Sequence, residues 1–206
     1  MSGDAADRAN KENQSPGRFS FRSPLKNRCN IDWRLPHQLV DHFCDIDFKA
    51  LAEQGITKVC LDVDNTLMPQ KAEVVDPAVV RHLAHAREQG YIEGICLISN
   101  VIWKGKRTQR LKRVAEVLDV EHYYGANFWT RKPSPKPFRW AIETLGSEPS
   151  QMAMIGDQIF ADIVGGNKMG FHTVLVKPMS SDHWTTLIIG RRWRESTFLK
   201  NYQIRP

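Results

Sequence analysis

The chain has 206 residues, of which 41% are hydrophobic and 25% charged, and these are ordinary values for a globular protein that buries a full core. No apolar run approaches the length needed to cross a bilayer, and no secretory signal is recognisable, so we expect a cytoplasmic protein, at most peripheral at the inner face of a membrane. The formal charge of +6 favours an anionic partner, and no nucleic-acid-binding module is recognisable.

The cysteines carry no metal-binding or disulfide pattern. The chain has four of them, and none forms a CxxC pair. This scatter indicates reduced, structural thiols rather than a zinc site or a disulfide framework.

The two ends of the chain differ in composition from its middle. Residues 1–30 are polar and basic and predict a disordered segment, which either stays in solution or contacts an anionic membrane. Residues 31–206 predict a single domain. Its last part, residues 182–206, predicts a helical, basic extension whose tryptophans and arginines either pack on the sheet or contact lipid.

The first ordered segments are short. Apolar residues recur at helical spacing over residues 37–43, and residues 47–55 predict a helix that begins at Asp47 and ends at Gly55. A short apolar strand begins at Lys58. A helix over residues 76–90 follows, with an N-cap and a proline in its first turn.

The remaining elements alternate between strand and helix. A basic amphipathic helix over residues 104–118 has an outer side that is either solvated or available to a polyanionic substrate or anionic lipid. The alternation predicts an α/β, doubly wound parallel sheet, in which ligands bind at the carboxyl ends of the strands. The other expected strands are residues 92–98, 122–125, 152–155 and 173–176, and the other expected helices are residues 138–145 and 159–169.

Acidic residues follow two of these strands directly. Asp62 and Asp64 come after the strand that begins at Lys58, and Asp157 and Asp162 come after the strand at 152–155. Asp62 and Asp64 alone are also consistent with a plain turn. Several carboxylates at neighbouring strand ends repel one another unless a cation lies among them, and oxygen ligands without His or Cys suit Mg²⁺.

Four short motifs, taken together, resemble those of the haloacid dehalogenase (HAD) superfamily. In chain order they are Asp62-x-Asp64-x-Thr66, Ser99-Asn100, Lys132-Pro133-x-Pro135 and Gly156-Asp157-x-x-x-x-Asp162. The resemblance implies a HAD-like sheet with helices on both faces, and phosphatase chemistry through an aspartyl phosphate.

The resemblance also implies a role for each motif residue. Asp62 would be the nucleophile, and Asp64 the general acid and base. Mg²⁺ would be held by Asp62, Asp157 and Asp64, the last through its backbone carbonyl. Ser99, Asn100 and Lys132 would bind the phosphate, and Lys132 fits the motif better than Lys136. Asp162 and Thr66 would support the site, Asp162 either as a further metal ligand or behind the ligands.

The short spacing between motifs leaves room for a minimal cap domain or none. An open site favours bulky substrates, such as a protein, a nucleic-acid end or a lipid headgroup. Residues 62–67 and 156–167 also resemble a bacterial group of subfamily IIIA related to the mitochondrial phosphatidylglycerophosphatases, although Ala161 stands where that group suggests Thr. This resemblance implies that phosphatidylglycerophosphate is converted to phosphatidylglycerol.

Two other functions stay open. One is a phosphatase of the same chemistry that acts on a soluble nucleotide or sugar phosphate. The other is a basic binding protein with a vestigial phosphatase site. No pattern in the sequence indicates the oligomeric state.

Overall fold

The structure is a computed structural model, and it describes residues 32–70, 72–101 and 105–180. The predictions for residues 1–30 and 182–206 lie outside the described residues. Within the described part, no helix is both long and apolar enough to cross a membrane.

A six-stranded parallel sheet forms the centre of the fold, with the strand order β1-β6-β5-β2-β3-β4. This confirms the predicted α/β, doubly wound sheet. The strands are β1 (Gln38–Val40), β2 (Lys58–Leu61), β3 (Gly94–Asn100), β4 (His122–Ala126), β5 (Met152–Gly156) and β6 (His172–Val176).

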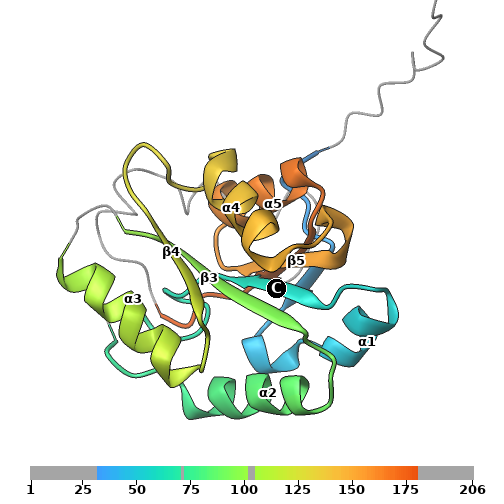
Figure 1. Ribbon diagram of the computed structural model, residues 1–206, viewed down its shortest axis with the longest axis horizontal. Coiled ribbons are helices and arrows are strands. Elements are labelled where there is room, and N and C mark those ends of the chain that lie inside the picture. The colour runs from blue at the N-terminus through green and yellow to red at the C-terminus, as the bar shows by residue number, and fades with distance from the viewer. Residues whose placement is uncertain (1–31, 71, 102–104, 181–206) are drawn as a thin grey trace, which may run out of the picture. The chain divides into compact units, whose positions relative to one another are not determined.

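Helices cover both faces of the sheet (Figure 1). One face packs against α1 (Phe48–Glu53), α2 (Pro77–Glu88) and α3 (Lys106–Val117), which lie below the sheet in Figure 1. The other face packs against α4 (Pro135–Leu145), and α5 (Val164–Met169) lies on the same side. Short helical turns complete the fold at η1 (Phe43–Asp45), η2 (Pro149–Gln151) and the π-helical η3 (Ile159–Ile163).

The central strands are buried on both sides, which is why they read as continuous apolar runs. In β2, Val59 and Leu61 join the core beneath α2 and α3, whereas Cys60 joins the core beneath α4. Cys60 and Cys96 pair in register across β2 and β3, and their sulfur atoms are 3.4 Å apart. Both are free thiols, as is Cys44.

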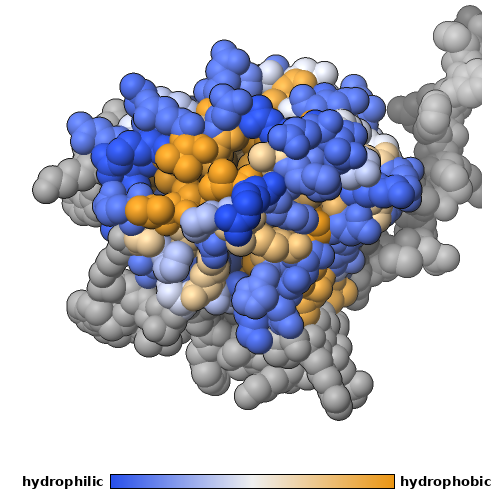
Figure 2. Space-filling model, turned by 90° about the horizontal axis from the view of Figure 1, so that it is seen from below, coloured by the Kyte–Doolittle hydropathy of each residue, from blue (hydrophilic) through white to orange (hydrophobic). Residues whose placement is uncertain are grey.

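The caps predicted for α1 and α2 are present. The Asp47 side chain accepts a hydrogen bond from the backbone of Ala50, and the Asp76 side chain accepts one from Ala78. α2 buries Leu83 and exposes Arg81 on its outer side. The side seen in Figure 2, from below in the view of Figure 1, is accordingly mostly hydrophilic, with an apolar patch between hydrophilic side chains.

The helix predicted over residues 37–43 is wrong. Residues 38–40 form the edge strand β1, which pairs with β6 in the register Gln38 to Val174 and Val40 to Val176, and a short 3-10 turn follows. Three residues of sequence cannot distinguish the two periodicities, so pairing with β6 decides the conformation. α4 also begins earlier than predicted, at Pro135, and the helix predicted over residues 159–169 is divided between η3 and α5.

Candidate active site

The site lies where the winding of the sheet reverses. β2 and β5 are neighbours, and the chain proceeds from β2 towards β3 on one side and from β5 towards β6 on the other. At such a point the connections leave in opposite directions and open a crevice at the carboxyl ends of the strands. Asp62 directly follows β2, and Asp157 directly follows β5.

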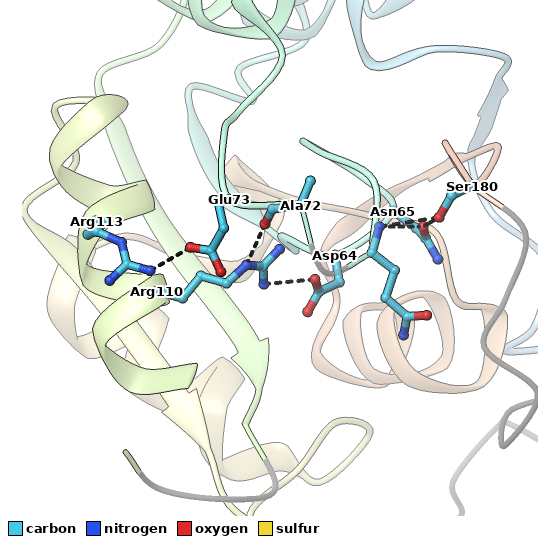
Figure 3. A network of polar contacts seen from close by, with 8 residues as sticks. Asp64, Asn65, Ala72, Glu73, Arg110, Arg113 and Ser180 are labelled. Atoms are coloured by element: carbon cyan, nitrogen blue, oxygen red, sulfur yellow. Dashed lines mark hydrogen bonds and ion pairs between the residues drawn. The ribbon is translucent and has the colours of Figure 1, made fainter. Parts of the chain in front are cut away.

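The first motif bends sharply after Asp62. The Asp62 backbone N–H still donates to Ile155 of β5 at 2.9 Å, so its position is fixed by the sheet. Asn65 then adopts a left-handed φ of 64°, which Asn tolerates better than most residues. Its side-chain oxygen accepts hydrogen bonds from the Ser180 hydroxyl at 2.6 Å and the Gln70 backbone at 3.1 Å, and these contacts hold the turn (Figure 3).

Lys132 is a buried cation at the centre of the site. Only 1% of its surface is exposed, and its ammonium nitrogen lies 2.6 Å from Oδ1 of Asp62 and 2.7 Å from Oδ1 of Asp162. The same nitrogen donates to the Ile98 carbonyl at 2.7 Å. The Asn100 side chain accepts a hydrogen bond from the Lys132 backbone at 2.9 Å, and the Lys132–Pro133 peptide bond is cis.

Three buried carboxylates gather around this lysine. Asp62, Asp157 and Asp162 each offer an oxygen, and these three atoms lie within 4.8 Å of one another. The Asp162 carboxylate is fixed by a hydrogen bond from the Gln158 backbone at 3.0 Å and lies directly against Gly156. A Cβ atom at Gly156 would overlap this carboxylate, so glycine is required at the end of β5.

The charges of the cluster shift one another. Burial raises the pKa of Asp62 to about 7, and Asp162 adds to this rise while Lys132 opposes it. Burial alone would lower the pKa of Lys132, but Asp162 and Asp62 raise it above its ordinary value, so the lysine stays charged. A positive charge is therefore fixed beside the Asp62 carboxylate.

The cluster fits a divalent cation. Oδ2 of Asp62 is buried and accepts no hydrogen bond. The cluster brings three carboxylates together against one ammonium group, with no His or Cys in it, and hard oxygen donors of this kind suit Mg²⁺. Asp62, Asp157 and Asp162 are the side chains that would hold the ion.

The Asp64 side chain points elsewhere. Its Oδ1 lies 2.8 Å from Nη1 of Arg110 on α3 (Figure 3). Arg110 also donates from Nε to the Ala72 carbonyl at 2.8 Å, and neighbouring Arg113 pairs with Glu73 at 2.6 Å. Two arginines of α3 thus tie the segment that follows the first motif to the helix.

Most of the buried polar side chains of the described residues belong to the four motifs. Thr173 is the exception. The rest are Asp62, Asn65, Thr66, Ser99, Lys132, Asp157 and Asp162. Lys136, the alternative to Lys132, is exposed on α4.

The structure adds three details of the site to the sequence prediction. The Asp162 carboxylate lies within the acidic cluster, whereas the Asp64 carboxylate does not, and the predicted metal role of the Asp64 carbonyl stays a prediction. Asn100 contacts the backbone of Lys132. Arg110 was expected only as part of a basic helix face, because no local signal connects α3 with the first motif.

Comparisons with known proteins agree with the resemblance of the sequence motifs to those of the HAD superfamily. The family model described as HAD-hydrolase-like matches residues 129–182, which contain Lys132, Asp157 and Asp162. The acidic site, the family model and the relatives below support a phosphoric monoester hydrolase that is similar to HAD-like phosphatases.

Three curated relatives show how far the similarity extends. "Probable phosphatase YqeG" of Bacillus subtilis is 29% identical over 71% of this chain and 79% of its own length. "Phosphatidylglycerophosphate phosphatase 1, chloroplastic/mitochondrial" of Arabidopsis thaliana is 28% identical over 82% of this chain, but the match spans 48% of that protein. "Glyceraldehyde 3-phosphate phosphatase" of Pyrococcus furiosus is 31% identical over 49% of this chain and 41% of its own length.

Proposed function

We propose that this chain hydrolyses the phosphomonoester of phosphatidylglycerophosphate at a membrane surface, through an aspartyl phosphate on Asp62 and with Mg²⁺ as cofactor. The observation that carries the proposal is the buried contact of 2.6 Å between Asp62 and Lys132, beside two further carboxylates. A carboxylate nucleophile next to a fixed cation suits phosphoryl transfer, in which positioning and charge compensation supply most of the catalysis.

In the first step, a carboxylate oxygen of Asp62 attacks phosphorus. The new bond to Asp62 forms while the bond from phosphorus to the leaving alcohol oxygen breaks. Asp64 donates a proton to that oxygen. Lys132 offsets the negative charge of the phosphoryl group, and Asn100 keeps Lys132 in place through its backbone.

In the second step, water attacks the aspartyl phosphate. Asp64, now a carboxylate, takes a proton from the water, and the bond between phosphorus and Asp62 breaks. Inorganic phosphate leaves and both aspartates return to their starting states. Mg²⁺, when bound at the acidic cluster, supplies positive charge that further offsets the phosphoryl oxygens.

Arg110 acts in this scheme as a positioning residue. It contacts Oδ1 of Asp64 and is itself anchored on the Ala72 carbonyl. The contact fixes the orientation of the Asp64 carboxylate and leaves Oδ2 for proton transfer. The Asp64 side chain is 35% exposed, which gives it access to water for the second step.

Three features support a lipid substrate. In the described residues, the chain between β2 and β3 contains only α2, and the chain between β3 and β4 contains only α3, so neither connection carries a cap domain. The formal charge of +6 also suits an anionic surface. The similarity to the Arabidopsis phosphatidylglycerophosphate phosphatase covers more of this chain than the similarity to the Pyrococcus enzyme.

A soluble sugar phosphate is the second candidate substrate. The relative from Pyrococcus, named for glyceraldehyde 3-phosphate, favours it. A binding protein with a vestigial site is not favoured, because an unused cation such as Lys132 would retain the cost of burying its charge.

Phosphate release from a substrate panel tests the proposal. The panel contains phosphatidylglycerophosphate in vesicles, a sugar phosphate, a nucleotide and an aryl phosphate, each with Mg²⁺ and with a chelator. We expect kcat/KM for the lipid to exceed that for the soluble compounds by at least about tenfold, and chelation to abolish release. A preference for the sugar phosphate would replace the lipid assignment, and no release from any compound would overturn the phosphatase reading.

A further inference from the structure

The loop after β4 exposes two large aromatic side chains. Phe128 is 54% exposed and Trp129 is 85% exposed. Their rings pack edge to face with centroids 5.4 Å apart, and the Arg131 guanidinium lies 5.0 Å from the centre of the Phe128 ring. The three residues therefore form one small surface of two rings and a cation, which we call the aromatic loop.

The backbone of the aromatic loop is held by its own side chains. Asn127 Oδ1 accepts hydrogen bonds from the backbone of Trp129 at 3.0 Å and of Thr130 at 3.1 Å. The Thr130 hydroxyl in turn accepts a hydrogen bond from the Asn127 backbone at 3.0 Å. These contacts fix a turn that presents the two rings outward, at the cost of leaving apolar surface in water.

The aromatic loop lies at the same edge of the sheet as the acidic cluster. It follows Ala126, which is in register with Asn100 at the carboxyl end of β3, and it directly precedes Lys132. In Figure 1 this segment is the loop that extends beyond β4 before the chain turns back to α4. A membrane into which the two rings insert would therefore lie next to the edge of the sheet that holds the acidic cluster.

The chemistry of the loop suits a bilayer that contains anionic lipid. Tryptophan favours the headgroup region, where its ring is apolar at one end and hydrated at the other, and arginine binds lipid phosphate. Lys136 and Arg139 are exposed on α4, the helix that the loop leads into, and add positive charge. Two rings bury about 300–500 Å² at most, which is far below the area of a stable protein interface but enough to hold a loop at a membrane.

We propose that the aromatic loop inserts Phe128 and Trp129 into the headgroup region of an anionic membrane while Arg131 contacts lipid phosphate, and so docks the active-site edge on its substrate surface. This inference rests on the proposed lipid substrate and adds the residues through which the enzyme reaches it.

Vesicle co-sedimentation tests the docking. The full chain, the double variant Phe128→Ala/Trp129→Ala and the matched control Trp33→Ala are compared on vesicles of phosphatidylcholine with and without phosphatidylglycerol. Trp33 is 40% exposed, and its carbonyl contacts Asn167 of α5, away from the acidic cluster. Thermal unfolding of each variant verifies that it folds.

We expect the double variant to partition at least about tenfold less onto the anionic vesicles, because it loses most of the inserted apolar area, and Trp33→Ala to bind like the natural chain. Arg131→Gln should weaken binding only when phosphatidylglycerol is present. Equal binding by the double variant, an equal loss with Trp33→Ala, or no vesicle binding by the natural chain would each overturn the docking.

Aryl phosphate turnover by the natural chain separates this inference from the proposed function. A chain that binds vesicles through the loop but releases no phosphate would contradict the phosphatase chemistry alone. A chain that hydrolyses aryl phosphate but binds no vesicle would contradict the docking alone.

Discussion

Two aspartates separated by one residue lie in contrasting surroundings. Asp62 is 5% exposed and pairs with Lys132, whose side chain is 1% exposed. The Asp64 side chain is 35% exposed and pairs with Arg110, which is 15% exposed. The sheet holds the first residue through a hydrogen bond to β5, whereas the second lies in the turn beyond it.

The contrast suits the two chemical tasks that we propose for Asp62 and Asp64. Attack on phosphorus needs an immobile oxygen in a site with little water, because electrostatic interactions are stronger there. Proton exchange with a leaving group and with water needs a carboxylate that solvent can reach. One strand end therefore supplies both environments within three residues.

Replacing Asp62, the proposed nucleophile, should have the largest effect on catalysis. We expect Asp62→Asn to lower kcat on aryl phosphate by at least about 10⁴-fold, because the amide cannot form the phosphoryl bond. The variant should remain folded, since Lys132 keeps Asp162 and the Ile98 carbonyl as partners. Steady-state phosphate release measures the effect, and activity within tenfold of the natural chain would rule out Asp62 as the nucleophile.

Removing the buried cation should affect both catalysis and folding. We expect Lys132→Met to lower kcat by about 10²–10³-fold, because it removes the charge that faces the phosphoryl oxygens. It should also destabilise the fold by about 3–5 kcal/mol, because Asp62 and Asp162 would lose their buried partner. Turnover and denaturant unfolding are the measurements.

Lys136→Met is the matched control for this variant, since Lys136 is exposed and only four residues away. It should match the natural chain in unfolding and lie within about twofold of it in aryl phosphate turnover. Equal turnover and equal stability of the two variants would contradict the role of Lys132 in catalysis and folding.

Disturbing the half-exposed pair should have a smaller effect. We expect Arg110→Ala to lower kcat by about tenfold, since Asp64 keeps its carboxylate but loses the contact that orients it. Arg110→Lys should restore part of the loss, because it keeps a positive charge beside Asp64. An unchanged rate in Arg110→Ala would reduce Arg110 to a structural contact.

The smallest expected effect is on the pH dependence of folding stability, and it concerns a residue outside the acidic cluster. Burial lowers the pKa of His172 from 6.5 to about 4, and His37, stacked on it at 4.7 Å, adds to the shift. Between pH 6.5 and pH 4 the unfolded chain binds this proton and the folded chain does not. Stability from this residue is therefore complete above pH 6.5 and is lost as the pH falls towards 4.

We expect His172→Gln to flatten this part of the stability curve, as measured by denaturant unfolding at a series of pH values. A curve as steep as that of the natural chain would assign the acid sensitivity to other groups. Either result shows how much of the acid sensitivity of the fold depends on His172.

Local signals were sufficient to predict much of the fold. Asp76 followed by Pro77 marks the start of α2 because a cap and a fixed φ act within one turn, and the buried strands are recognisable by composition. β1 was mistaken for a helix because its conformation depends on pairing with β6, more than 130 residues away along the chain. Ser134 and Pro135 did carry the signal for the true start of α4.

In the site, too, some features could be predicted from the sequence and others depend on long-range packing. Parallel strands bring their carboxyl ends to one edge, so the convergence of Asp62 with Asp157 could be inferred from the alternation of elements. The pairing of Asp64 with Arg110 could not, because it depends on how α3 packs beside the first motif. The exposure of the Trp129 ring could not be predicted either, since an aromatic residue near a strand end is more often buried.

Trapping the intermediate tests the central claim most directly. In Asp64→Asn, hydrolysis of the aspartyl phosphate should be slowed, so a rapid acid quench during turnover of aryl phosphate should preserve it. Peptide mass spectrometry should then find phosphate on Asp62, and none in the Asp62→Asn variant. Phosphate on another residue, or on none while product is still released, would contradict the account.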